Sequence, residues 1–296
     1  NEILALKKVD EIRDDFALRG RSELYRVDLK SMASAHRLHQ GINLRGHQVW
    51  ASYEHFQEIL AIRNQPADEE LWDIVEFFAS HSDPNLFKER HALSQSEFRK
   101  LVQPLIRTGH IVQDFRGGFR SVFVPEGVDR AELRKEYIRK LVEKFPVITL
   151  RQMTQLAGPS FKPEELKAVL NTFEEDGTLI KGFLIEDFHQ VCWGRKELLE
   201  EARSIPAIRD FVLPPSDPIA PYFADIMKER FGFGSAYLVF RNAEPVAAFK
   251  ANTRNKIIDV KDYEGSEKAW RIVKEFAWEH QMPLQTELRI GGKKLQ

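Results

Sequence analysis

The chain has 296 residues, of which 43% are hydrophobic and 11% aromatic, enough for two or three domains with their own cores. Its 44 Lys and Arg residues nearly balance 45 Asp and Glu residues, giving a net charge of −1, so any affinity for nucleic acid must come from a local arrangement of cations. No apolar run reaches the ~18 residues of a membrane helix, no secretory signal opens the sequence, and a single cysteine excludes an internal disulfide, which together favour a soluble cytoplasmic protein.

Residues 1–64 have a mostly helical pattern. Apolar residues recur at three- and four-residue spacing in residues 3–18 and again in residues 53–62, with a polar stretch between them. We expect a helical N-terminal region without an assigned function. His36 and His39 lie three residues apart, but no cysteine or nearby carboxylate completes a set of four ligands, so we expect no metal site and no other cofactor.

A segment that repeats at an offset of 68 residues comes next. Residues 97–124 align with residues 165–192 without a gap, and the apolar positions coincide. In both copies a helical pattern ends at a glycine, Gly109 or Gly177, that can adopt a positive φ, and alternating apolar residues follow. Helix, glycine cap and hairpin form the second half of a winged helix, so the repeat predicts two winged helices in tandem, at 65–128 and 129–205.

The first copy carries the candidate nucleic-acid surface. We expect helices at 69–80 and 95–108, the second with a Ser94–Glu97 capping box and Pro104 inside it, and strands at 111–115 and 119–124. The apolar face of the second helix points inward, which leaves its other side and the hairpin outward. The outward residues are Arg99, Lys100, Gln103 and Arg107 on the helix and Arg116 and Arg120 in or beside the hairpin. These side-chain types contact phosphates and base edges, although a solvated helix face is the alternative.

The second copy has a less cationic outward face. We expect helices at 130–145, 150–157, 164–176 and 196–204 and strands at 147–150, 179–185 and 190–193. Lys162, Lys167 and Asn171 point outward there, but Glu164, Glu174, Glu175 and Asp176 do so too. DNA contact and a protein-facing or structural role are therefore equally favoured for this face.

The prolines at 214, 215 and 218 mark a boundary near the start of a small α+β domain, which we place at residues 206–296. Its pattern predicts a helix at 222–231, strands at 236–240, 246–251 and 256–260, and a covering helix at 267–280. The predicted fold class is α+β, mainly helical, with tandem winged-helix domains followed by a small antiparallel β domain and its covering helix. Asp217 lies in the proline-rich turn, which we expect to be exposed; it is a candidate general base, with turn capping as the favoured alternative.

Residues 137–151, 165–186 and 216–222 resemble the carboxyl-terminal winged-helix region of Lhr-type large helicases. The architecture is also similar to that of the AlkZ and YcaQ winged-helix DNA glycosylases. The first resemblance implies a DNA-binding accessory module with a helicase motor in the same or another chain; no Gly-x-x-x-x-Gly-Lys-Ser/Thr phosphate loop occurs here. The second implies base excision, for which that family uses a Gln-x-Gln pair that this sequence lacks.

Three functions follow from these patterns. We prefer a tandem winged-helix module that binds nucleic acid, DNA rather than RNA, as part or partner of a DNA-repair helicase. A DNA glycosylase of the AlkZ/YcaQ type is the alternative, and a transcription regulator is the third option.

Overall fold

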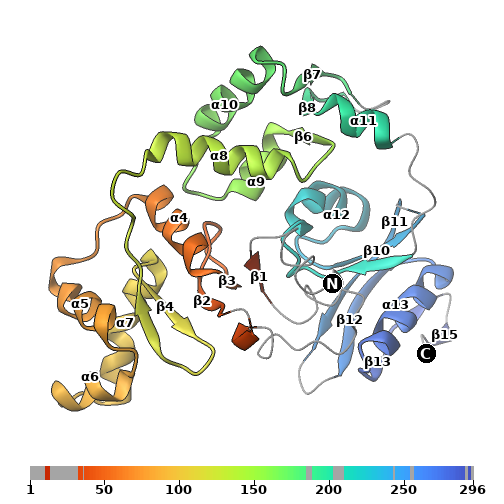
Figure 1. The fold of residues 1–296 in the computed structure, drawn as a ribbon. Helices are drawn as coiled ribbons and strands as arrows, with labels where there is room; N and C mark the ends of the chain where they lie inside the picture. The colour runs from red at the N-terminus through yellow and green to blue at the C-terminus, as the bar shows by residue number, and fades with distance from the viewer. Residues whose placement is uncertain are drawn as a thin grey trace. The chain divides into compact units, whose positions relative to one another are not determined.

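A computed structural model describes residues 11–13, 33–35, 37–184, 189–202, 210–242, 244–253, 257–290 and 293–294. The chain divides into two compact units. We call the described residues 11–200 the winged-helix unit and the described residues 201–294 the β unit. The mixture of helices and mostly antiparallel sheets confirms the α+β class (Figure 1). Among the described residues, none of the helices combines the length and apolar character needed to cross a membrane.

The winged-helix unit contains a five-stranded sheet with the order β1-β3-β2-β4-β5. Its strands are β1 (Glu11–Ile12), β2 (His39–Ile42), β3 (Gln48–Ala51), β4 (Ile111–Asp114) and β5 (Phe119–Ser121). Strand β2 pairs with both β3 and β4, with His39 opposite Asp114. The hairpin of the first repeat therefore extends a sheet that begins in the N-terminal region.

This sheet corrects the expectation that residues 1–64 are mostly helical. Within the described part of that range, residues 11–12, 39–42 and 48–51 are strands, and the long helix is α4 (Tyr53–Arg63), close to the predicted 53–62. The β2–β3 turn depends on Asn43, whose Oδ1 accepts hydrogen bonds from the amides of Arg45 (3.1 Å) and His47 (2.9 Å). An asparagine that closes a turn onto its own backbone favours a hairpin over a continued helix.

The first repeat consists of three helices and a hairpin. The helices are α5 (Trp72–Ser80), preceded by the 3₁₀ turn η1 (Glu69–Leu71), α6 (Pro84–Arg90) and α7 (Gln95–Thr108). The capping box of Ser94 and Glu97 is confirmed, and Pro104 lies inside α7. Helix α6 was not expected; it begins with Pro84 after Asp83, whose carboxylate accepts the Asn85 amide at 2.8 Å. A proline at the first helical position needs no backbone donor, which suits it to this start.

The second repeat follows the same order. It comprises α8 (Arg130–Val142), β6 (Val147–Thr149), α9 (Leu150–Ala157), α10 (Pro163–Glu175), β7 (Ile180–Gly182), β8 (Cys192–Gly194) and α11 (Lys196–Ala202), with sheet order β6-β8-β7. Gly109 after α7 has φ +92° and Gly177 after α10 has φ +79°, which confirms the repeated glycine cap. The two copies differ after the first strand of the hairpin. Strand β5 begins at Phe119 and β8 at Cys192, so β8 begins five residues later than the 68-residue offset predicts.

The β unit is built on a second five-stranded sheet, with the order β13-β12-β11-β10-β9. Its elements are β9 (Phe211–Leu213), the 3₁₀ turn η2 (Ala220–Phe223), α12 (Ala224–Phe231), β10 (Tyr237–Arg241), β11 (Glu244–Asn252), β12 (Ile258–Gly265), α13 (Glu267–Glu279) and β13 (Leu284–Thr286), followed by the short pair β14 (Arg289–Ile290) and β15 (Lys293–Lys294). Strands β9 and β13 are additions to the predicted meander, and β13 runs parallel to β12.

Helices cover both faces of this sheet. Tyr237 and Val239 belong to the core shared with α13, whereas Leu238 and Phe240 belong to the core shared with α12. Side chains of successive strand residues point to opposite faces, which explains the division. The predicted buried stripe of α13 is confirmed, because all six of its expected core residues are buried. Parts of the predicted N-terminal helix (3–10 and 14–18), the tip of the second hairpin (185–188), the end of the 196–204 helix (203–204) and two turn segments (243 and 254–256) lie outside the described residues.

Candidate nucleic-acid interface

The outward side of α7 matches the sequence prediction. Arg99, Lys100, Gln103 and Arg107 are all exposed. The opposite side is buried in the core of the first repeat through Phe98, Val102 and Leu105. Burial of this stripe fixes the rotation of the helix about its axis, so the polar side faces away from the core.

The β4–β5 hairpin carries the other two predicted cations. The carboxylate of Asp114 accepts hydrogen bonds from the amides of Arg116 (2.8 Å) and Gly118 (2.9 Å), which sets the shape of the turn. Arg116 is exposed at this turn. The guanidinium carbon of Arg120 lies 3.7 Å from the centroid of the Tyr53 ring. Stacking on an aromatic ring positions an arginine without neutralising it, so its positive charge is kept.

His39 packs beside this stacked pair. Its ring centroid lies 5.7 Å from that of Tyr53, and its buried Nδ1 has no hydrogen-bond partner within the described residues. Burial and then the charge of Arg120 lower the pKa of His39, so its imidazole is neutral at pH 7. His36 lies outside the described residues, and within the described residues no group of three or more His, Cys, Asp or Glu side chains could hold a metal ion.

In the second repeat, the predicted face is partly occupied by internal contacts. Lys162 and Lys167 are exposed. The Oδ1 of Asn171 accepts a hydrogen bond from Nζ of Lys181 at 3.1 Å, and the same ammonium lies 3.2 Å from the Glu174 carboxylate. This cross-link between α10 and β7 favours a structural role for Asn171.

Asp217 belongs to the β unit and is buried, with 5% of its surface exposed. The expectation that it lies exposed in the turn is therefore wrong. Its Oδ1 accepts the Ile219 amide at 2.9 Å, and its own amide donates to the Pro214 carbonyl at 3.0 Å. These bonds are those of a residue that closes a turn, which is the alternative interpretation favoured by the sequence.

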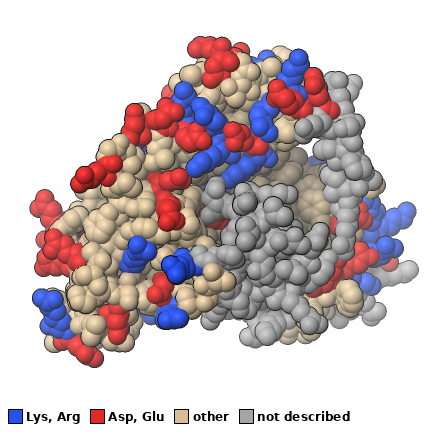
Figure 2. Space-filling view, in the orientation of Figure 1, with Lys and Arg blue, Asp and Glu red and all other residues tan. Residues whose placement is uncertain are grey.

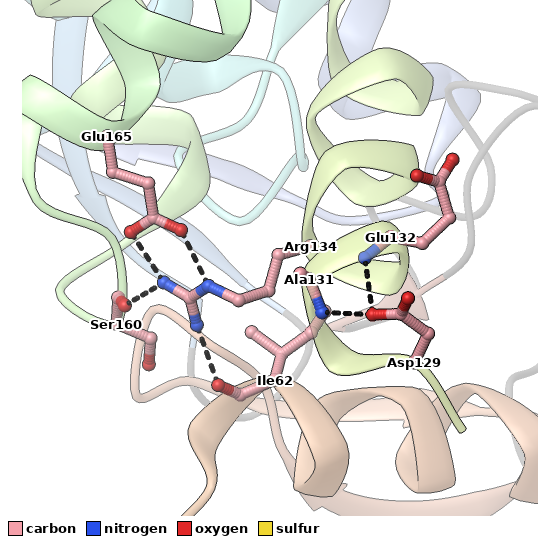
Figure 3. Close-up of polar contacts among 7 residues, drawn as sticks. All are labelled: Ile62, Asp129, Ala131, Glu132, Arg134, Ser160 and Glu165. Atoms are coloured by element: carbon pink, nitrogen blue, oxygen red, sulfur yellow. Dashed lines mark hydrogen bonds and ion pairs between the residues drawn. The ribbon is translucent and has the colours of Figure 1, made fainter. Parts of the chain in front are cut away.

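A bridge made by Arg134 joins the second repeat to α4 of the N-terminal region (Figure 3). From α8, its guanidinium donates to both carboxylate oxygens of Glu165 on α10, at 2.6 and 2.7 Å, and to the carbonyls of Ile62 and Ser160, each at 2.7 Å. The hydrogen bonds from Arg134 lower the pKa of Glu165. Because Ile62 lies in α4, the bridge sets the position of the second repeat relative to the sheet of the first.

Sequence patterns missed a group of cations on α8. Figure 2 shows Lys and Arg side chains gathered over the region of α8 and α9, with acidic side chains beside them. On α8, Lys140 pairs with Glu58 at 3.3 Å and Arg139 with Glu136 at 2.9 Å, in addition to the pair of Arg134 with Glu165. The mixed charges of the α8 sequence hid this group, because the pattern there was interpreted only as a helix of the second repeat.

The two helix–glycine–hairpin copies and the helix-covered sheet define an α+β protein, and the helix–hairpin order of the copies fits a winged-helix fold. In fold, the chain is similar to the solved structure of the Streptomyces sahachiroi DNA glycosylase AlkZ, with a TM-score of 0.62 and 12% sequence identity over 95% of this chain and 92% of the AlkZ chain. The sequence matches no family model, and no curated protein sequence matches it. At this identity the likeness is one of fold.

Proposed function

We propose that the protein binds duplex DNA through the outward side of α7 and the β4–β5 hairpin, and that it acts in the repair of damaged bases. The observation that carries the proposal is the likeness to AlkZ, which extends over 95% of the chain and so includes both units. That extent favours the glycosylase architecture over the alternative of a helicase tail, for which the likeness offers no support.

The charges on α7 support DNA contact. Within the described residues, none of Arg99, Lys100 and Arg107 takes part in an ion pair, so their charges are available to phosphates. Affinity for DNA that comes from such contacts decreases steeply with salt, by a slope of about 0.9 per phosphate contact in a plot of log affinity against log salt concentration.

Binding is tested by fluorescence anisotropy with a labelled 20-base-pair duplex at several salt concentrations. We expect Arg99→Ala with Arg107→Ala to reduce the slope by ~1.8 and the affinity by roughly ten-fold or more at 100 mM salt. The matched control is Lys228→Ala with Lys274→Ala, which removes two exposed cations from helices of the β unit. Equal slopes for the two double variants would contradict the proposed surface.

Base excision is a second candidate function, favoured by the same likeness. AlkZ is a DNA glycosylase, and such enzymes act on a base that has been extruded from the duplex. Since this sequence lacks the Gln-x-Gln pair, excision would depend on other side chains. The test is incubation with duplexes that contain uracil, N7-methylguanine or N3-methyladenine, followed by alkaline cleavage at abasic sites; no product from any duplex rejects this candidate.

A further inference from the structure

A pocket of about 380 Å³ lies within the winged-helix unit, where the end of α4, the start of α5 and the chain leaving β5 meet. Its inner wall consists of the buried side chains of Leu60, Val75 and Val122. The size falls in the range of ~300–1,000 Å³ that is typical of small-molecule sites. None of the residues predicted from the sequence to bind DNA lines it.

Two aromatic rings stand at the rim of this pocket. Trp72 is 42% exposed and Phe123 is 40% exposed, which is unusual for rings that line a cavity. The indole N–H of Trp72 donates to the Glu76 carboxylate at 3.0 Å, and the backbone carbonyl of Phe123 accepts from Gln57 at 2.9 Å. The first bond holds the Trp72 ring and the second holds the backbone of Phe123, and neither bond uses a ring face. Exposed, fixed aromatic faces are the surfaces on which flat heteroaromatic rings stack.

His110 provides a hydrogen-bond acceptor in the same pocket. The Thr108 hydroxyl lies 3.1 Å from the carbonyls of Pro104 and Leu105 and 2.8 Å from Nδ1 of His110. We assign the hydroxyl proton to one of the two carbonyls, so that the hydroxyl oxygen accepts from His110 and Nδ1 carries the hydrogen. Burial and the charge of Arg63 lower the pKa of His110. The ring is therefore neutral at pH 7, and with this assignment its Nε2 is an acceptor.

Asn64 and Arg130 add donors on the wall. Asn64 ends α4 in the left-handed conformation, with φ +50°, which asparagine tolerates better than most residues. Its side-chain oxygen accepts a hydrogen bond from Nη1 of Arg130. This pairing leaves the Asn64 amide N–H₂ and the remaining guanidinium N–H groups as donors, while His110 contributes the acceptor.

We propose that this pocket binds a single nucleobase, stacked on Trp72 and Phe123 and recognised at an edge that carries both an N–H donor and an acceptor. We take the base to belong to a nucleotide extruded from DNA, and this part of the inference rests on the proposed function. A free nucleoside carries the same edge and the same flat ring, so the experiment has one arm for each source.

The first arm uses 2-aminopurine deoxyriboside, whose fluorescence is quenched when the base stacks on an aromatic ring. We expect saturable quenching by the wild-type protein, at least about five-fold weaker binding in Trp72→Ala and in Phe123→Ala, and recovery in Trp72→Phe. Trp278→Ala is the matched control, because Trp278 is 82% exposed on α13 of the β unit. Absence of saturable binding in both arms, or binding that Trp72→Ala leaves unchanged, overturns the pocket.

The second arm uses a duplex with 2-aminopurine opposite an abasic analogue. A fluorescence change on protein binding that is lost in Trp72→Ala supports an extruded base as the occupant. A response to the free nucleoside with none to the duplex overturns the DNA source and leaves a nucleoside site. The variant Arg99→Ala with Arg107→Ala separates the two proposals: if it binds duplex as well as wild type while Trp72→Ala loses the nucleoside, the DNA surface is wrong and the pocket stands.

Discussion

Replacing Arg134 by methionine removes the bridge between α4, α8 and α10 while keeping an unbranched side chain of similar reach (Figure 3). The change deletes four hydrogen bonds of 2.6–2.7 Å and the stacking of the guanidinium over Phe161, whose centroid lies 4.2 Å away. A hydrogen bond to a charged group contributes roughly 1.5–3 kcal/mol, but bonds made by one side chain are not additive.

Exposure sets the expected magnitude. The side chains of Arg134 and Glu165 are 22% and 34% exposed, so water can reach the carboxylate once its partner is gone. We therefore expect a loss of about 2–3 kcal/mol in the free energy of unfolding, below the ~3–5 kcal/mol for breaking a fully buried pair. Urea denaturation followed by circular dichroism measures this change.

A surface pair provides the comparison. Arg271 pairs with Glu275 at 2.9 Å, but both side chains are mostly exposed, so Arg271→Met is expected to cost no more than ~0.5 kcal/mol. A double-mutant cycle of Arg134→Met with Glu165→Gln then isolates the coupling between the two charges. If Arg134→Met costs no more than Arg271→Met, or if the cycle shows no coupling, the bridge does not stabilise the unit.

Two further predictions concern pH and the start of α7. Burial lowers the pKa values of His39, His47 and His110 below 6.5. Below about pH 6.5 these histidines therefore bind more protons in the unfolded chain than in the folded one. The free energy of unfolding should be constant above that pH, and below it should fall by at most ~1.4 kcal/mol per pH unit for each histidine. Urea titrations at pH 7.5, 6.5 and 5.5 measure this, and equal midpoints at all three would refute it. Ser94→Ala removes the side-chain half of the capping box, in which the Ser94 hydroxyl accepts from the Glu97 amide at 3.3 Å and donates to the Glu97 carboxylate at 2.6 Å. This change should cost ~1 kcal/mol in stability, whereas Ser96→Ala, two residues later in the first turn, should cost less than half of that. Similar losses for the two variants would argue against the cap.

Local patterns in the sequence were sufficient to predict the helices of the repeat. The apolar stripe of α7 and its cap at Gly109 lie within 15 residues, and both are set by short-range periodicity. The same holds for α10, with Gly177 shortly after its end. The six buried residues of α13 were predicted for this reason as well.

Contacts between distant segments were not predictable in this way. Strand β2 has a polar sequence, and its position in the sheet depends on β4, more than 70 residues later. The burial of Asp217 likewise depends on the packing around the turn, while residue types alone indicated only that a turn exists. The pocket beside Trp72 combines residues 60 to 130, none of which carries a motif. The pairing of β2, the burial of Asp217 and the pocket therefore depend on long-range packing, which local sequence patterns do not encode.

The central claim is that DNA contacts α7 and the β4–β5 hairpin. Amide hydrogen exchange of the protein with and without a saturating duplex tests it most directly. Slower exchange on binding is expected in peptides that cover residues 95–121, with a smaller effect or none in residues 163–182 of the second repeat. Protection confined to α10 and β7, or to the β unit, would contradict the claim.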